Sequence, residues 1–543
     1  MKPIEAKLTR GVLAEYREKI IHSVLYQVNP YLHAKTYEGN QGNDMYAEPE
    51  FTGKYVDICM ELYRNTGDEK ALENAKIVVG SILKHQRKDG YLGCLPDGKE
   101  TLNFGVWNQA FTILGLLSYY KVTKDKRILD AALKSVSYTM RYFIDEKRDI
   151  LDALNYGTQH ISILLPLCKL YEITNNAEIK GYIFYIVERI KTSDLNFFDF
   201  EDILKLRSKK GIENFVVLLG ILEYARLFGD DAAVVSVEKY WQQLCDTQIR
   251  NTGNGTINEL WTEGGGACML LSSDVKPNET CVAVGWIELS LTLFYLTQES
   301  KYLDAIDKTL YNHVLASVAD DGSDFAYYQP NFGKKVRVTE YGMYKCCRYR
   351  GFTLFSYMNE MLFYEDEKQV IPMIYTSGIY QSNDIKIQME TDYPYNPTVV
   401  VSVNPRKNKL LKLRVPQKCE FANLEIDGTK SDKVTTNGYV EIELKQDETT
   451  KIKLVLANQI LFEEGKIGEK KYAACSYGPI LLAAEHMQTN EMIKEPLRLE
   501  QATSDSSHKI GFRAQGEAEG EKTTIQFCEY SSADDYNVWI ETK

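Results

Sequence analysis

The spacing of hydrophobic residues changes once along the chain and divides it into two parts. Up to about Tyr364 the apolar residues recur at helical spacing with polar residues between them, as at Trp107, Phe111, Leu114, Leu117 and Tyr120. Beyond the acidic stretch 365–368 the period becomes two, as in Ile385–Met389 and Tyr439–Leu444, which is typical of half-buried strands. The pattern therefore predicts a helix-rich first part and a strand-rich second part.

A short phrase recurs through the helical part and marks the ends of helices. It stops each time at a polar pair such as Gly-Asp or Asn-Asn, after Thr66, Thr123, Thr174, Phe228 and Thr297. A second helical segment follows the stop, as in 71–83 and 127–143, so the repeating unit is a helical hairpin. Such hairpins can close into an (α/α)6 barrel. The alternative is an open helical solenoid, which the long and irregular spacing of the repeats disfavours.

The strands of the second part are separated by Gly, Pro, Asn and Asp clusters at short intervals, which is typical of an antiparallel β-sandwich. We therefore predict a mainly α protein with a β domain. The (α/α)6 barrel is expected over residues 1–365 as the catalytic domain, and the β-sandwich over 366–543 as an accessory domain.

Composition narrows the class of partner. The 543 residues carry a net charge of −12 and are 44% hydrophobic, which is ordinary for a globular protein. A pI near 5.4 without a run of Lys or Arg argues against nucleic acid or an anionic membrane surface as the partner. A small molecule or glycan fits better, and oligomer formation is left open.

The N-terminal residues and the cysteines bear on the compartment. Charged residues interrupt the first twenty positions, so no apolar core of a signal peptide is expected, and no apolar run approaches the ~18 residues that span a bilayer. We expect a cytoplasmic protein. Its eleven cysteines, an odd number, then favour free thiols, metal ligands or a nucleophile over a disulfide framework.

Soft metal ligands are concentrated in two segments. These are Glu279-Thr280-Cys281 and Cys346-Cys347, the second placed on a loop before the helical run 352–362. Three thiolates and one carboxylate form a sensible set of ligands for Zn²⁺. The spacing alone leaves ordinary buried thiols as an alternative.

The order of several phrases resembles a known enzyme family. Glu279-Thr-Cys281, Thr309-Leu-Tyr-Asn312, Asp320-Asp-Gly322, Tyr327-Tyr328 and Cys346-Cys347 together resemble the signature of glycoside hydrolase family 127, the β-L-arabinofuranosidases. The resemblance spans most of the chain and implies an (α/α)6 barrel before a β-sandwich. It also implies that Glu279, Cys281, Cys346 and Cys347 hold zinc and that Cys346 is the nucleophile. A sulfur nucleophile displaced by water would give net retention at the anomeric carbon.

The resemblance further implies a glutamate that acts as acid and base upstream of the Glu-x-Cys phrase. Glu259, in Glu259-Leu-Trp261, matches the family's Glu-x-aromatic phrase and lies 20 residues before Glu279. Glu263 lies 16 residues before it and matches a shorter loop. We favour Glu259, because loop length varies more than local motif, and expect Trp261 to wall the pocket. That both are solvated loop acids is the alternative.

Three residues are implied as sugar contacts. His160 lies where the family often carries Gly-His-x-Glu, although Gln159 and Ser162 replace the Gly and the Glu. Gln109 follows Trp107 where relatives carry a basic residue, and Tyr328 is placed near the site. A structural histidine near a helix end is the alternative for His160, as a core position is for Trp107.

We therefore expect a glycosidase that acts on an oligosaccharide or other glycoside, releasing a β-L-arabinofuranosyl or related sugar through a zinc-bound cysteine. Two alternatives remain at this point. One is a non-catalytic glycan-binding or scaffold protein with a structural zinc, and the other is a lyase or sugar epimerase on the same barrel, since fold alone does not fix function.

Overall fold

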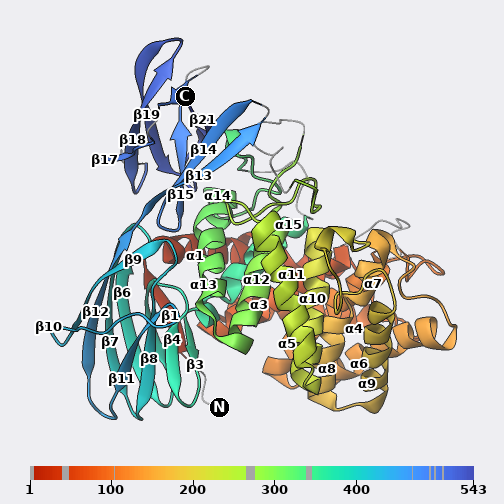
Figure 1. Ribbon diagram of the computed structural model, residues 1–543. Coiled ribbons are helices and arrows are strands. Elements are labelled where there is room, and N and C mark those ends of the chain that lie inside the picture. Colours follow the sequence, from red (N-terminus) through yellow and green to blue (C-terminus); the bar gives the residue numbers. More distant parts are fainter. Residues whose placement is uncertain are drawn as a thin grey trace.

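The computed structural model describes residues 5–38, 48–102, 104–264, 275–337, 345–467, 469–487, 491–494, 497–503 and 507–543. A helical body forms the larger part of the molecule, with one β unit packed at its side and a second β unit above both (Figure 1). The fold is thus the predicted helical barrel followed by β structure that is antiparallel except where β4 (Gln369–Pro372) pairs with β8 (Lys409–Arg414).

Six helices of the described residues form the inner ring of the barrel. Each contacts the next, and the last contacts the first, in the order α3 (Glu48–Thr66), α5 (Gly105–Thr123), α8 (Leu164–Thr174), α10 (Gly211–Phe228), α12 (Thr280–Thr297) and α15 (Cys346–Ser356). Helices α5, α10 and α12 are buried on nearly all sides, as expected for helices that pack on both neighbours and on the outer layer. The closed ring confirms the (α/α)6 barrel and excludes the open solenoid.

An outer layer covers this ring. It consists of α1 (Val12–His22), α4 (Glu69–His85), α6 (Lys126–Met140), α9 (Ala177–Lys191), α11 (Asp231–Thr247) and α13 (Ser300–Thr309), and shorter helices are α2 (Pro30–Lys35), α7 (Thr158–Ile161) and α14 (Leu315–Ser317). The outer helices bury one face only. Several begin at a capping side chain, for example Asp68, Asp125 and Asn176, each accepting from the backbone N–H two residues on. Five inner helices end at the predicted stops.

Two features of the inner ring follow from composition. Helices α3 and α5 approach closely at Gly53 and Gly115, where an added Cβ would collide with the facing backbone. The expectation that no apolar run reaches the length of a membrane span is wrong for α12, which is apolar and long enough to cross a membrane, but 67% of its apolar window is buried inside the protein. It is therefore one of the core helices of the barrel.

The first β unit is a sandwich of two sheets. One has the order β1 (Glu5–Arg10), β5 (Ser377–Gln381), β6 (Ile385–Asp392), β7 (Asn396–Pro405), β12 (Thr450–Asn458), β9 (Cys419–Ile426) and β10 (Thr429–Lys430). The other has β11 (Tyr439–Leu444), β8 (Lys409–Arg414), β4 (Gln369–Pro372) and β3 (Phe363–Glu365). Strand β6 alternates buried and exposed residues along its whole length, as the period of two predicted.

The second β unit is a separate sheet. Its main order is β13 (Ile460–Ile467), β14 (Lys470–Tyr477), β15 (Ile480–Glu485), β19 (Glu521–Glu529), β18 (Gly511–Ala518) and β16 (Met492–Ile493), joined by β2 (Phe332–Lys334), β17 (Glu500–Ala502), β20 (Asp535–Asn537) and β21 (Ile540–Glu541). The structure thus divides the region expected as one sandwich over 366–543 into two units that meet near Asn458. It also adds β1 and β2, which come from the segment expected to be the helix-rich barrel domain.

A buried ion cluster joins the barrel to the sandwich. The guanidinium of Arg414, on β8 and fully buried, pairs with both Asp304 and Asp307 of α13. Tyr393 Oη donates to Asp307 Oδ2 at 2.9 Å, and Tyr375 Oη donates to the Arg414 carbonyl at 2.6 Å. Buried charges need such partners, so this cluster fixes the position of the sandwich on α13.

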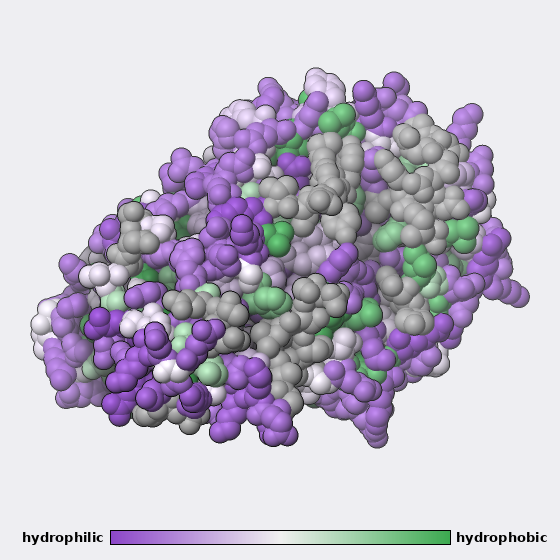
Figure 2. All heavy atoms as spheres, turned by 90° about the horizontal axis from the view of Figure 1, so that it is seen from above, coloured by the Kyte–Doolittle hydropathy of each residue, from purple (hydrophilic) through white to green (hydrophobic). Residues whose placement is uncertain are grey.

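The face seen in Figure 2 is mainly hydrophilic, with apolar residues in scattered groups.

Candidate active site

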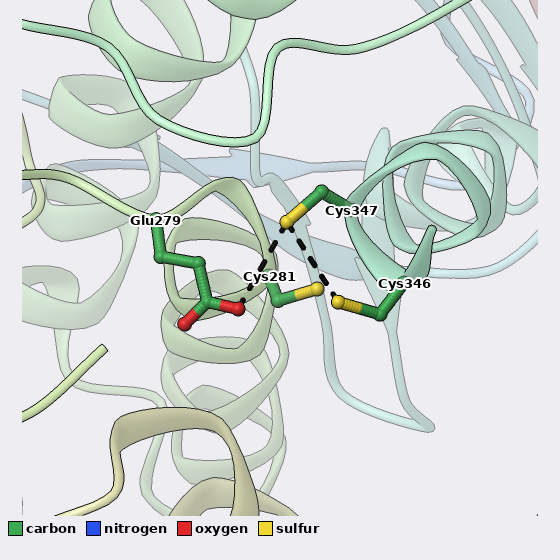
Figure 3. A group of neighbouring side chains, drawn as sticks. All are labelled: Glu279, Cys281, Cys346 and Cys347. Atoms are coloured by element: carbon green, nitrogen blue, oxygen red, sulfur yellow. Dashed lines mark hydrogen bonds between the residues drawn. The ribbon is translucent and has the colours of Figure 1, made fainter. Parts of the chain in front are cut away.

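The predicted ligand residues meet at the starts of two inner helices. Glu279 and Cys281 lie at the start of α12, and Cys346 and Cys347 are the first residues of α15 (Figure 3). One ligand atom of each lies within 4.8 Å of all the others. The expectation that the Cys346-Cys347 pair lies on a loop is wrong, because α15 begins at Cys346 itself.

The donor atoms suit a metal of the zinc type. Cys281, Cys347 and Glu279 are buried, and Glu279 Oε2 has no hydrogen-bond partner among the described residues. A buried carboxylate oxygen without a partner is costly unless a cation or a proton compensates for it. Three sulfurs and one carboxylate form a complete set for tetrahedral Zn²⁺. The cluster therefore fits such an ion.

Electrostatics single out Cys346 among the three thiols. Hydrogen bonds from Cys281 and Cys347 hold the pKa of Cys346 well below its ordinary value, and the Lys54 ammonium acts in the same direction. Burial raises the pKa of Cys281 and of Cys347. The N-terminal end of α15 also favours a thiolate there. Cys346 is thus the sulfur that loses its proton most readily of the three.

A cavity of about 320 Å³ opens at Cys346. Its lining comes largely from the first turns of inner helices, because these helices all begin at the same mouth of the barrel. Phe51, Phe104 and Trp107 supply apolar surface. Its charged lining residues are Glu50, Lys54, Lys210, Glu213, Glu259, Glu279 and Lys345. Burial raises the pKa of Glu50, Glu213 and Glu279.

Glu259 lies in this cavity and is held from three sides. Tyr328 Oη donates to its Oε1 at 2.7 Å, Tyr327 Oη donates to the same oxygen at 2.9 Å, and Lys210 forms an ion pair with Oε2. Cys346 Sγ lies 3.4 Å from the Tyr327 hydroxyl, within hydrogen-bond distance. Tyr327 therefore links the candidate nucleophile to the candidate acid.

The surroundings of Glu259 differ from the expectation in one respect. Trp261 does not line the cavity: it is buried and packs edge-on against Phe215, with ring centroids 5.7 Å apart. The carboxylate is instead contacted by an ammonium and two phenols. Glu263 is exposed and is absent from the described lining of the cavity.

Of the three expected sugar contacts, the structure places only Tyr328 at the cavity. His160 is buried, and its Nδ1 and Nε2 face the carbonyl oxygens of Ile150 (3.1 Å) and Thr101 (2.7 Å). Burial lowers the pKa of His160 to about 4. Gln109 is buried and accepts from Ser135 Oγ of α6 at 3.0 Å. The geometry therefore supports a structural role for His160. The Nε2 of Gln109 is buried without a hydrogen-bond partner among the described residues, and neither side chain belongs to the described cavity lining.

Sequence reasoning did not find several charged lining residues. Lys210, Glu213, Glu50 and Lys54 lie in or next to the first turns of α10 and α3. These residues could have been predicted from their position near the start of an inner helix, because the inner helices begin at the same barrel mouth where Cys281 lies.

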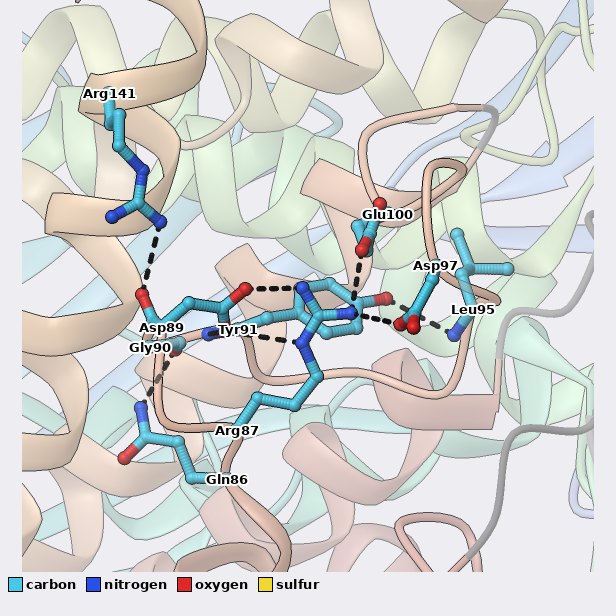
Figure 4. Close-up of polar contacts among 9 residues, drawn as sticks. All are labelled: Gln86, Arg87, Asp89, Gly90, Tyr91, Leu95, Asp97, Glu100 and Arg141. Atoms are coloured by element: carbon cyan, nitrogen blue, oxygen red, sulfur yellow. Dashed lines mark hydrogen bonds and ion pairs between the residues drawn. The ribbon is translucent and has the colours of Figure 1, made fainter.

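A network of ion pairs centred on Arg87 lies in the connection between α4 and α5 (Figure 4). Arg87 donates to Asp89 (3.1 Å), to Asp97 (2.7 Å) and to Glu100 (2.6 Å). Its guanidinium also lies over the ring of Tyr91, 4.9 Å from the centroid. One side chain thus joins both ends of the connection between α4 and α5.

Comparison with known proteins agrees with this fold. The model of the GH127 β-L-arabinofuranosidase catalytic domain matches residues 9–360, and that of the GH127 middle domain matches 373–458. The chain therefore belongs to glycoside hydrolase family 127. The second β unit, beyond residue 458, lies outside both matches.

Individual relatives are distant in sequence. A non-reducing end β-L-arabinofuranosidase of Bifidobacterium longum subsp. longum is 22% identical over 303 residues, which span 46% of this chain and 43% of that protein. A GH127 β-L-arabinofuranosidase from Geobacillus stearothermophilus T6 has the same fold, with a TM-score of 0.77 and 18% identity over 99% of this chain and 100% of that one. Another GH127 β-arabinofuranosidase superposes with a TM-score of 0.78 at 16% identity, covering 100% of this chain and 98% of that one.

Proposed function

We propose that this protein is a retaining glycoside hydrolase that releases a β-L-arabinofuranosyl or related sugar, with Cys346 as a zinc-bound nucleophile. One observation carries the proposal: Cys346 and Glu259 border the same cavity and are joined through Tyr327. A retaining glycosidase needs a nucleophile and an acid at one scissile bond. Family membership supports the type of reaction.

Glu279, Cys281, Cys346 and Cys347 would hold the zinc ion. When bound, zinc would keep the Cys346 sulfur ionised and disperse its charge, so that the sulfur is both a nucleophile and a leaving group. With four protein ligands the ion would have no open position for a catalytic water. The metal is therefore assigned to tuning the nucleophile.

The two chemical steps use residues of this chain. In the first step the Cys346 sulfur forms a bond to the anomeric carbon while the bond to the leaving oxygen breaks and Glu259 gives that oxygen its proton. In the second step Glu259, now ionised, takes a proton from a water molecule that attacks the same carbon, and the sulfur departs. Two inversions give net retention.

Lys210, Tyr327 and Tyr328 position the Glu259 carboxyl group for its two roles as acid and as base. The ammonium stabilises the ionised form, which is the form needed in the second step, and the phenols fix the direction of the carboxylate. Glu259 remains our choice over Glu263, because only Glu259 is placed at the cavity within the described residues.

A screen of nitrophenyl glycosides tests the proposal, beginning with p-nitrophenyl β-L-arabinofuranoside. We expect release of nitrophenol, with the sugar first liberated as the β anomer. A glycan-binding protein with a structural zinc would bind metal without turning over any glycoside. A lyase would produce a new double bond and an epimerase an isomer of the sugar, and either product would refute the assignment.

A further inference from the structure

A second group of metal-ligating side chains lies in the β unit beyond the family matches. Glu485, His508 and Cys528 each offer a ligand atom within 4.8 Å of the other two. Glu485 ends β15, Cys528 lies on the neighbouring strand β19, and His508 precedes β18, which pairs with β19. Three adjacent segments of one sheet thus direct nitrogen, oxygen and sulfur to one point.

We propose that Glu485, His508 and Cys528 bind a Zn²⁺-type divalent ion, separate from the site in the barrel. Imidazole, carboxylate and thiolate are the three ligand classes that zinc accepts. The carboxylate and imidazole are already adjacent, with His508 Nε2 2.9 Å from Glu485 Oε2. Both side chains are largely buried, at 13% and 12% exposure, and Cys528 is 4% exposed.

Neighbouring polar groups hydrogen-bond to these side chains and orient them, as the groups around the ligands do in known metal sites. His508 Nδ1 lies 2.7 Å from Ser532 Oγ, which donates to the Glu529 carbonyl at 3.2 Å. The Ser532 oxygen is therefore free to accept from Nδ1–H, which leaves Nε2 as the ligand nitrogen. The backbone N–H of Asp534 donates to Glu485 Oε1 at 2.8 Å, which leaves Oε2 for the ion.

The loop carrying His508 is anchored independently. The backbone N–H groups of Lys509 and Ile510 donate to the Glu529 carboxylate at 2.8 and 3.1 Å. His508 is thereby held beside Cys528 by contacts other than its own. With three protein ligands, a fourth position remains for a water or small anion from the cavity of about 680 Å³ that these residues line.

The same residues also form a hydroxyl, imidazole and carboxylate chain that resembles a hydrolase relay. The geometry favours the metal, because the backbone N–H groups near Ser532 are already engaged. Those of Ser532 and Ala533 donate to the Glu529 carbonyl, and that of Asp534 donates to Glu485. The turn therefore leaves none of these donors for an oxyanion.

Zinc content of the full chain tests the proposal. Chelator-treated protein is dialysed against Zn²⁺ alone, and bound zinc is measured by elemental analysis. We expect about two zinc ions per chain in the wild type, one fewer in His508→Ala and in Glu485→Gln, and an undiminished content in His486→Ala. His486 lines the same cavity outside the ligand group and so controls for surface binding.

A Cys281→Ser background separates the two sites. In it one zinc ion should remain and should disappear when His508→Ala is added. Glu485→Gln keeps the size of the side chain, and far-ultraviolet circular dichroism verifies that each variant is folded. Equal zinc in the wild type, His508→Ala and Glu485→Gln would overturn the proposal, and so would equal losses in His486→Ala and His508→Ala.

Discussion

Replacing Glu259 by Ala tests the structural choice between the two candidate acids. The carboxylate is 19% exposed and accepts from Tyr327 and Tyr328 at the cavity, whereas Glu263 lies on the exposed surface. General acid catalysis contributes on the order of 10² to 10⁴-fold, or about 3 to 5 kcal/mol of transition-state stabilisation. Glu259→Ala should lose that much kcat/KM on alkyl glycosides, and Glu263→Ala should stay near the wild type.

The tyrosine contacts give a graded version of the same test. Tyr328→Phe removes one of the two phenol hydrogen bonds to Glu259 but leaves the acid in place. A hydrogen bond to a charged group contributes about 1.5 to 3 kcal/mol, so the loss should reach at most about 10 to 100-fold. The order of activity should therefore be wild type, then Tyr328→Phe, then Glu259→Ala.

Leaving-group dependence is the decisive assay for Glu259. Transfer of the sugar from an activated nitrophenyl glycoside to Cys346 needs little protonation of the leaving oxygen. Glu259→Ala should therefore lose far less activity on such substrates than on alkyl glycosides. Azide should restore turnover of the intermediate, since it needs no general base. If Glu263→Ala shows both behaviours while Glu259→Ala stays near the wild type, the reasoning from cavity geometry is wrong.

Three further changes test other parts of the structure. Arg414→Ala should destabilise the chain by about 3 to 5 kcal/mol in denaturant unfolding, because Asp307 is left buried without its cation, and a loss below 1 kcal/mol would contradict the role of this cluster. Burial lowers the pKa of Lys308 to about 8, so the folded protein binds a proton at Lys308 less tightly than the unfolded chain does. At pH 7 the charged side chain therefore destabilises the folded state. Lys308→Met should be more stable than the wild type at that pH by on the order of 1 to 3 kcal/mol. That difference should shrink as the pH rises from about 8 to above 10, while the exposed Lys301→Met should show no such trend. Cys281→Ser should lose the zinc ion of the barrel site, and an undiminished zinc content in this variant would refute the ligand assignment.

The barrel could be predicted because its signals are local. The polar stops after Thr66, Thr123 and Thr174 fall at the ends of α3, α5 and α8, where a capping side chain starts the next helix. The division of the β region into two units could not be predicted, because the alternation of buried and exposed residues along a strand does not tell which sheet the strand joins. Strand β1 also pairs with β5, from which more than 360 residues separate it.

The site was predictable only in part. Glu279, Cys281, Cys346 and Cys347 could be grouped because the family resemblance places both phrases together. Lys210 contacts Glu259 through the return of the chain to the same barrel mouth, a relation that local sequence does not encode. His160 and Gln109 illustrate the converse, because similarity of a short phrase does not determine the direction of a side chain.

The most direct test of the central claim is to identify the atom that carries the sugar. A mechanism-based arabinofuranosyl inactivator is incubated with the zinc-loaded enzyme, and the labelled peptide is located by mass spectrometry. The account predicts a single glycosyl adduct on Cys346, absent from Cys346→Ser and longer-lived in Glu259→Ala. Reproducible labelling of a cavity carboxylate such as Glu213, with Cys346 unmodified, would contradict it.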